Sequence, residues 1–463
     1  MNFSQKKTIA YGAALLALVA LGVAVLYSLP SKPAYPPPVA VLKASLQTGG
    51  APVEVSFDGT GSSGQEGQTL SMRWDFGDGQ SAQGVTVKHA YTRGGVYNVT
   101  LTVSDQDARS ARDDFELNLI GFSAKAFPVG DTPTNLVRGD FNRDGYLDLA
   151  LTAIRDGQVT TLLGKSGGGF ETDTVAVGRS PGSLAVGDFN ADGNQDLAVL
   201  SVVDDEAAVL TGSPEGVFKL ATTLSTGAFP NGVVSGDFDG DGVVDLAVVS
   251  AYGNTVELYT GKGDASFVLD SSLPVGNFPN FVTAGDFNEN GLEDLVVANL
   301  EEANISLLLR GKDDQFQQTK NTRAKLNPTA VAIGDFNEDG HQDLAVVNEG
   351  SNNLSISIGD GTGAFPYDER GIRVGKLPHW VTSGDFDGDG HLDLVVVNAD
   401  DNNISLLLGT GKGTFSSPIL FAVGQAPYAA VSGDFNKDGV LDLAVTNAAD
   451  STLTLLLGQA NAP

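Results

Sequence analysis

The sequence predicts an all-β protein in which a small β-sandwich precedes a seven-bladed β-propeller. A nine-residue loop occurs seven times, starting at Asp140 and ending with the copy at Asp434, and successive copies are 48 to 50 residues apart. A fixed period of this length indicates a repeat architecture, and four strand candidates per repeat without helical periodicity favour a propeller. Upstream, alternating runs such as Tyr97–Val103 lie between glycine-containing turns and predict a sandwich.

Composition narrows the class of function. The chain has 463 residues, 58 of them glycine and none of them cysteine, so disulfides and thiolate metal sites are excluded. Its formal net charge is −30 with only 27 basic residues. Nucleic-acid binding needs basic clusters and is therefore not expected. A strong acidic excess is typical of a solvated surface or of a protein that binds cations.

The first 29 residues predict export. Lys6 and Lys7 precede an uncharged, mainly apolar stretch over residues 8–29 that is long enough to cross a bilayer as a helix. The basic flank predicts a cytoplasmic N-terminus and a remainder outside the cytoplasm. We expect an uncleaved membrane anchor, with a cleaved signal peptide as the alternative, which would make the protein secreted. Five prolines within residues 30–38 then predict a stiff, extended linker.

Residues 39–120 form the predicted sandwich. The segments Trp74–Gly79, His89–Tyr91 and Gly95–Val103 resemble the PKD family. That resemblance implies an immunoglobulin-like sandwich that serves as an extracellular spacer or weak binding module. Trp74 is expected to pack in its core, because a large aromatic side chain dominates burial in so small a domain.

Residues 122–463 are predicted to form the propeller. Each loop reads Gly-Asp-Phe-(Asn/Asp)-x-(Asp/Asn)-Gly-x-x-Asp-Leu, and this repeat resembles the FG-GAP and VCBS families, found in integrin α-chain propellers and bacterial surface proteins. Seven copies imply seven blades. In the third repeat, the four strand candidates are Gly232–Ser235, Leu246–Ser250, Thr255–Tyr259 and Ser266–Ser271.

The two ends of the repeat region predict closure into a ring. After the last loop only two strand candidates remain, Leu443–Thr446 and Thr452–Leu457. A segment matching the missing outer strand, Phe122–Gly130, lies before the first loop. We expect it to complete the last blade and so remove an exposed sheet edge.

The loop is a candidate Ca²⁺ site. Positions 1, 3, 5 and 9 are always Asp or Asn, and a Gly at position 6 allows a tight turn that brings these oxygens together. An all-oxygen set suits Ca²⁺ rather than zinc, and the alternative is an acidic Asp-Gly turn. Up to seven ions are expected, bound most tightly by copies three and six, which have four Asp each, and most weakly by copy four. The predicted ligands are Asp140, Asn142, Asp144, Asp148; Asp188, Asn190, Asp192, Asp196; Asp237, Asp239, Asp241, Asp245; Asp286, Asn288, Asn290, Asp294; Asp335, Asn337, Asp339, Asp343; Asp385, Asp387, Asp389, Asp393; and Asp434, Asn436, Asp438, Asp442.

Two histidines, His341 and His391, occupy position 7 of their loops. At this position the backbone carbonyl would bind the metal, so their side chains are expected to face solvent.

The opposite face of the propeller is the candidate ligand face. The residues just after a recurring proline differ from repeat to repeat. Aromatic rings occur there at Phe281, His379, Trp380 and Tyr428. Such rings can stack on a sugar or hold a peptide side chain, whereas ordinary variation at a strand start is the alternative. The resemblance to integrin propellers implies that ligands bind on this same face.

Together these features predict an exported, membrane-anchored protein at the cell surface or in the periplasm. Its calcium-stabilised propeller would bind an extracellular carbohydrate or protein ligand, with the PKD-like domain as a stalk. No catalytic constellation is legible, so an enzyme is not expected. The alternatives are a carbohydrate lyase or hydrolase on a propeller scaffold, or a purely structural envelope protein.

Overall fold

The computed structural model describes residues 36–311, 315–318, 321–366 and 369–459. Contacts divide the chain into two compact units, one within the first 117 residues and one dominated by residues 118–463. Apart from one short 3₁₀ helix, η1 (Glu349–Ser351), every regular element in the described residues is a strand. The all-β prediction is therefore confirmed.

The predicted anchor at residues 1–29 and most of the proline-rich linker lie outside the described residues. Within the described ranges, no helix has the length and hydropathy needed to span a bilayer.

The N-terminal unit is built on two sheets. One has three strands in the order β1-β3-β6, and the other has five in the order β2-β8-β7-β4-β5. Their strands are β1 (Lys43–Ala44), β2 (Thr48–Gly50), β3 (Val53–Asp58), β4 (Ser71–Asp75), β5 (Ser81–Gln83), β6 (Thr86–Tyr91), β7 (Gly95–Ser104) and β8 (Ser110–Ile120).

Trp74 lies at the centre of this unit, as its place in a small sandwich predicts. Its side chain is fully buried, and its ring centroid is 5.7 Å from that of Phe57. Its Nε1–H donates a 2.8 Å hydrogen bond to the carbonyl of Gly84, so the indole loses no polar contact on burial. The expected core role of Trp74 is confirmed.

The repeat unit consists of seven antiparallel sheets among the described residues, each with its strands in near-sequential order. The first strands are β10 (Pro133–Gly139), β14 (Pro181–Gly187), β18 (Pro230–Gly236), β22 (Pro279–Gly285), β27 (Pro328–Gly334), β31 (Pro378–Gly384) and β35 (Pro427–Gly433). The second strands are β11 (Asp148–Ala153), β15 (Asp196–Ser201), β19 (Asp245–Ser250), β23 (Asp294–Asn299), β28 (Asp343–Asn348), β32 (Asp393–Asn398) and β36 (Asp442–Asn447).

The third strands are β12 (Gln158–Lys165), β16 (Glu206–Gly212), β20 (Thr255–Gly261), β24 (Asn304–Arg310), β29 (Asn353–Ser357), β33 (Asn403–Leu407) and β37 (Thr452–Gly458). The outer strands are β13 (Gly169–Ala176), β17 (Phe218–Ser225), β21 (Phe267–Pro274), β25 (Phe316–Gln318) with β26 (Thr322–Arg323), β30 (Ile372–Arg373), β34 (Ile419–Ala422) and β9 (Phe122–Pro128). These boundaries agree with the four strands predicted for the third repeat, now β18 to β21.

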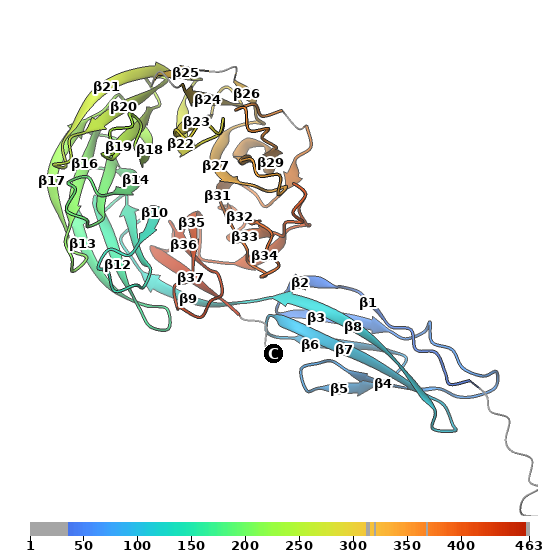
Figure 1. Ribbon diagram of the computed structural model, residues 1–463. Helices are drawn as coiled ribbons and strands as arrows, with labels where there is room; N and C mark the ends of the chain where they lie inside the picture. The colour runs from blue at the N-terminus through green and yellow to red at the C-terminus, as the bar shows by residue number, and fades with distance from the viewer. Residues whose placement is uncertain (1–35, 312–314, 319–320, 367–368, 460–463) are drawn as a thin grey trace, which may run out of the picture. The chain divides into compact units, whose positions relative to one another are not determined.

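The seven sheets are arranged around a common axis (Figure 1). Each first strand contacts the first strand of the next sheet, and β35 contacts β10, so these contacts form a complete circle. The segment β9, which precedes the first loop, pairs antiparallel with β37 from Thr452↔Pro128 to Gly458↔Phe122. The predicted closure of the last sheet by the start of the repeat region is thus confirmed.

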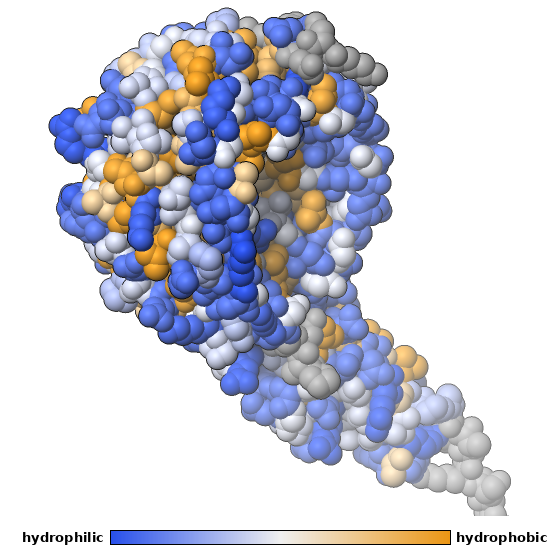
Figure 2. Space-filling view, turned by 60° about the vertical axis from the view of Figure 1, so that its left-hand side comes forward, coloured by the Kyte–Doolittle hydropathy of each residue, from blue (hydrophilic) through white to orange (hydrophobic). Residues whose placement is uncertain are grey.

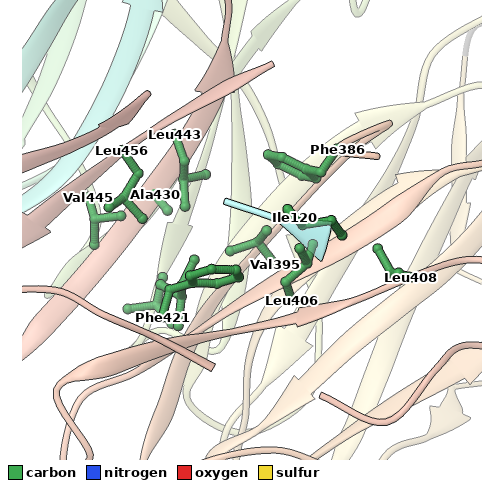
Figure 3. Packing of buried hydrophobic residues seen from close by; sticks show 12 residues of the cluster. Ile120, Phe386, Val395, Leu406, Leu408, Phe421, Ala430, Leu443, Val445 and Leu456 are labelled. Carbon is green, nitrogen blue, oxygen red and sulfur yellow. The ribbon is translucent and has the colours of Figure 1, made fainter. Parts of the chain in front are cut away.

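Hydrophobic packing between neighbouring sheets holds the circle together. The second strand of every sheet is buried along its whole length, because a sheet lies against each of its faces. Figure 3 shows one such core, where residues of β32 to β34 meet residues of β35 to β37. Each large apolar side chain buried in this way contributes about 1.5–3 kcal/mol. By contrast, the outer strands β17 and β21 are largely exposed, and the face in Figure 2 is mainly hydrophilic with scattered hydrophobic residues.

Candidate metal centre and axial cavity

Each acidic loop connects the first strand of a sheet to its second strand, so all seven loops lie at the same end of the circle of sheets. The Asp at position 9 is the first residue of the second strand and is buried in every copy. In the first copy, Asp148 Oδ2 accepts the N–H of Phe141 at 2.7 Å and Oδ1 accepts the N–H of Gly164 at 2.6 Å. The same pair of bonds recurs in the other six copies. Position 9 therefore ties the loop to the end of the third strand, a role that the sequence pattern did not reveal.

Backbone hydrogen bonds within the loop fix its remaining positions. A carboxylate oxygen at position 1 accepts the N–H of the position-6 Gly at 2.8–3.0 Å in all seven copies. The side-chain oxygen at position 5 accepts the N–H of position 7 at 2.7–2.9 Å. The seven loops thus share one conformation regardless of their acidic content.

Two residues of each loop adopt left-handed backbone conformations. The Gly at position 6 was expected to do so, but position 4 does as well, with φ near 59° at Arg143 and 80° at Gly240. The Gly at position 4 in copies three and six could have indicated this conformation from the sequence, since only Gly adopts the left-handed region without steric cost.

Burial of the position-9 carboxylates raises their pKa. This effect outweighs the backbone N–H donors, which lower the pKa, and neighbouring Asp residues add to it. The pKa reaches about 6 at Asp245, Asp294 and Asp442 and about 7 at Asp393. These loops are therefore centres of unfavourable negative charge at neutral pH, which a cation would relieve.

The side-chain oxygens of the loops are the kind of donor atom that a hard cation such as Ca²⁺ prefers. Carboxylate oxygens of Asp237, Asp239 and Asp241 lie within 4.8 Å of one another in copy three, as do those of Asp385, Asp387 and Asp393 in copy six. In the described part of the chain these are the two groups of at least three acidic or histidine ligands; in the other copies Asn replaces one or more carboxylates.

Two loop oxygens in other copies, Asp140 Oδ1 and Asn288 Oδ1, are buried without a hydrogen-bond partner among the described residues. Convergent oxygens, and buried ones left unsatisfied, are what a Ca²⁺ site requires.

His341 and His391 are about one third exposed, in line with the expectation that they face solvent, and each also pairs with the neighbouring loop. His341 Nδ1 contacts Glu289 Oε1, and His391 Nδ1 contacts Glu338 Oε1, each glutamate being at position 4 of the preceding copy. The hydrogen bond from the glutamate is the main cause of a raised pKa in both histidines. These pairs join adjacent sheets, and their partners lie about 52 residues apart in the sequence.

Arg310 is a second feature that the repeat pattern did not bring out. It lies 16 residues after the position-9 Asp of copy four, where the six other repeats have Gly. Its side chain is 1% exposed, and Nη1 donates a 3.2 Å hydrogen bond to the carbonyl of Asp237, position 1 of loop three. Comparing the repeats at this position would have identified it.

A cavity of about 450 Å³ lies at the opposite end of the first strands, on the axis of the circle. Phe281, His379, Trp380 and Tyr428, the four predicted ligand residues, all line it. The rings of Phe281 and Trp380 meet edge to face at 5.6 Å, and those of His379 and Tyr428 lie 5.0 Å apart. We call this the axial cavity.

The remaining wall of the axial cavity combines aliphatic and polar side chains. His379 Nδ1 lies 3.2 Å from Glu349 Oε2, and both side chains are about one quarter exposed. Burial, and then the charge of Glu349, raise the pKa of Tyr428. The wall also contains neutral amides and hydroxyls, from Asn135, Ser183, Asn231, Asn280, Thr283 and Thr329, and aliphatic side chains such as Leu136, Leu184 and Val282. The cavity thus combines aromatic surface with neutral hydrogen-bonding groups.

Comparison with known families identifies both units. A model described as FG-GAP-like repeat matches six overlapping stretches, 140–199, 188–248, 237–297, 286–346, 335–396 and 385–445. A PKD domain model matches residues 35–118. The first family covers well over half of the chain.

Curated relatives share only short stretches with the chain. Collagenase ColA of Clostridium perfringens is 41% identical over 54 residues, which are 12% of this chain and 5% of that protein. Collagenase ColQ1 of Bacillus cereus is 35% identical over 60 residues, 13% of this chain and 6% of that protein. The chain therefore spans only a small fraction of the length of these relatives.

Several solved structures have a similar fold. The periplasmic gluconolactonase PpgL of Pseudomonas aeruginosa matches with a TM-score of 0.50 and 16% identity over 78% of this chain and 98% of its own. A protein from Lactobacillus plantarum matches with a TM-score of 0.51 and 15% identity, and with the same coverage of both chains. BBS1N, solved in complex with ARL6DN, matches with a TM-score of 0.52 and 11% identity over 74% of this chain and 98% of its own. At such low identity, these matches show likeness of fold alone.

Proposed function

The chain belongs to the FG-GAP-like repeat family and carries an N-terminal PKD domain, and from this we propose that it is an exported surface protein. Its seven sheets would be the blades of a β-propeller, and the PKD domain would be the stalk that presents it. Lys6, Lys7 and the apolar residues 8–29 support anchoring in the membrane with the propeller outside the cytoplasm.

We propose that Ca²⁺ binds in the acidic loops. The side chains at positions 1, 3, 5 and 9 and the carbonyl at position 7 would hold the ion, as the convergent carboxylates of copies three and six suggest. A bound ion would supply positive charge where the fold concentrates carboxylates. The loops' own hydrogen bonds set the backbone, so the ion's contribution would be mainly to offset charge repulsion.

The function that the geometry supports best is recognition of an extracellular carbohydrate or protein ligand in the axial cavity. The observation that carries this proposal is the convergence of four aromatic residues from three different sheets on one cavity of about 450 Å³. A ring face can stack on a sugar or on an apolar side chain, and the neighbouring amides can hydrogen-bond its polar edge. Among the described residues that line the cavity there is no lysine, and His379 pairs with Glu349.

Glycan and peptide arrays probed with residues 36–463 test this proposal. A ligand held by the cavity should lose affinity by about 1–3 kcal/mol in Trp380→Ala, the loss typical of an anchoring aromatic residue. Phe267→Ala, which removes an aromatic ring from outer strand β21, is the matched control and should bind normally. Unchanged binding in both Trp380→Ala and Phe281→Ala would place the ligand elsewhere.

A second candidate is an enzyme that uses the propeller as a scaffold. The observation in its favour is the His379–Glu349 pair inside the axial cavity, since such a pair can take up and release a proton. The fold likeness to a gluconolactonase is compatible with hydrolysis but says nothing about substrate. Turnover of a bound glycan that His379→Ala abolishes, while binding is retained, would favour this candidate. Without any ligand on either array, a purely structural envelope role becomes the better explanation.

A further inference from the structure

Loops three and six are a matched pair. Both read Asp-Phe-Asp-Gly-Asp-Gly, and in each loop three carboxylates lie within 4.8 Å of one another, from positions 1, 3 and 5 in loop three and from positions 1, 3 and 9 in loop six. The same backbone hydrogen bonds hold positions 1, 6 and 7 in each. Ligand count and backbone conformation alone would give the two loops similar affinity for a cation.

Loop six has His391 at its position 7, paired with Glu338, whereas loop three has a buried arginine behind it. Behind loop three, the guanidinium of Arg310 reaches from the end of β24 to the carbonyl of Asp237. Its Nη2 also lies 3.2 Å from the point where a Cβ on Gly240 would be. The equivalent residue behind loop six is Gly458, at the end of β37, the third strand of the next sheet. Loop three therefore has a buried positive charge against its positions 1 and 4, and loop six has none from this source.

Glu293 accompanies Arg310. It occupies position 8 of loop four, and a Cβ on Gly236 would collide with its Oε2, so its carboxyl lies directly beneath the start of loop three. Burial and the charge of Asp237 raise the pKa of Glu293, while Arg310 lowers it. Repeats two and five have Gln195 with Gly212 and Gln342 with Gly359 in the same two places. The Glu-Arg combination thus differs from the Gln-Gly combination of repeats two and five, which shows that the fold does not require it.

We propose that Arg310 tunes the cation affinity of loop three, making it the weaker of the two four-carboxylate sites. This inference rests on the proposed binding of Ca²⁺ in the loops. A fixed positive charge close to a divalent site opposes the ion, and it also stabilises the same carboxylates when the ion is absent. The loop backbone is already held by its own hydrogen bonds, and Arg310 is a buried cationic side chain at a place where the equivalent residue behind loop six is Gly458. A single charge at roughly 6 Å in a water-like dielectric changes the affinity for a divalent ion about tenfold.

Site-resolved hydrogen exchange tests the proposal in the full-length chain purified in mild detergent. Exchange in peptides covering loops three and six is followed as free Ca²⁺ is raised from chelator to 10 mM. Loop six should become protected at about tenfold lower Ca²⁺ than loop three. The double variant Glu293→Gln/Arg310→Gly, which copies the pattern of repeats two and five, should move the loop-three midpoint to that of loop six. The midpoint of loop six should stay unchanged, so that loop serves as the internal control.

Equal midpoints in the parent chain, or tighter binding by loop three, would overturn the proposal even if the variant did not fold. A variant that folds but leaves the loop-three midpoint in place would also overturn it. These results differ from failure of the proposed function, in which Ca²⁺ would protect neither loop at any concentration and both proposals would fall.

Discussion

At the scale of single residues, the position-9 Asp has a structural role in addition to the metal-binding role that the sequence predicts. The spacing of Asp and Asn predicted a metal ligand, and nothing in a nine-residue motif points to a partner 16 residues later. In the structure, both oxygens of Asp196 accept backbone N–H groups, from Phe189 at 2.9 Å and Gly212 at 2.8 Å. The residue is thus part of the fold whether or not a cation is bound.

This role predicts a large effect of Asp196→Asn even in chelator. The amide would turn an N–H₂ group toward a buried N–H donor, and the lost charge-assisted hydrogen bond should cost about 2–4 kcal/mol of unfolding free energy. Asp192→Asn, at the exposed position 5 of the same loop, is the control and should cost less than about 1 kcal/mol. Urea unfolding measures both. Similar small losses in the two variants would show that position 9 serves only as a ligand.

The raised pKa of the position-9 carboxylates predicts an unusual pH dependence in chelator. The folded pKa is about 6 at Asp245 and about 7 at Asp393, above the ordinary value of 3.8. Between these values the folded state binds more protons than the unfolded state, so metal-free stability should fall as pH rises from about 4 to about 7. Thermal melts at several pH values check this. A flat profile, or stability that increases over this range, would mean that these groups ionise normally in the folded protein.

At the scale of strands and loops, the sequence predicted best those features that depend on residues within a single repeat. The Gly-Asp-Phe loop and the apolar runs placed β18 to β21 correctly, because local alternation and turn residues decide them. Contacts between repeats were missed. Neither the His341–Glu289 pair nor Arg310 against loop three can be read from the sequence, since each depends on which residues of adjacent sheets meet after the circle closes.

The closing strand provides the prediction at this scale. A chain starting at residue 122 keeps β9 and should give a cooperative, monomeric repeat unit. A chain starting at residue 131 lacks β9, leaves the edge of β37 unpaired and should aggregate or unfold without cooperativity. Light scattering and thermal melts distinguish the two. Equal stability and monomeric behaviour of both chains would contradict the importance assigned to β9.

At the scale of the whole molecule, charge is the property that most needs explanation. The chain has a formal charge of −30, and the seven loops gather much of it at one end of the repeat unit. Seven divalent ions would reduce this charge to about −16. Each site stabilises the folded state by about 2.7 kcal/mol when the free ion is at a hundred times its dissociation constant, so even weak sites add up. The sequence predicted the seven repeats and the four aromatic residues that line the axial cavity, but not the rest of its wall, which is assembled from all seven sheets.

The most direct test of this account is the melting of residues 36–463 in excess Ca²⁺ and in chelator, with the bound ion measured by calorimetric titration. Calcium should raise the melting temperature of the repeat unit by several degrees while that of the PKD domain, which has none of the seven loops, hardly changes. A repeat unit that binds no Ca²⁺ at millimolar concentration, or that melts identically in chelator, would contradict the central claim and leave the seven loops as acidic turns held by their own hydrogen bonds.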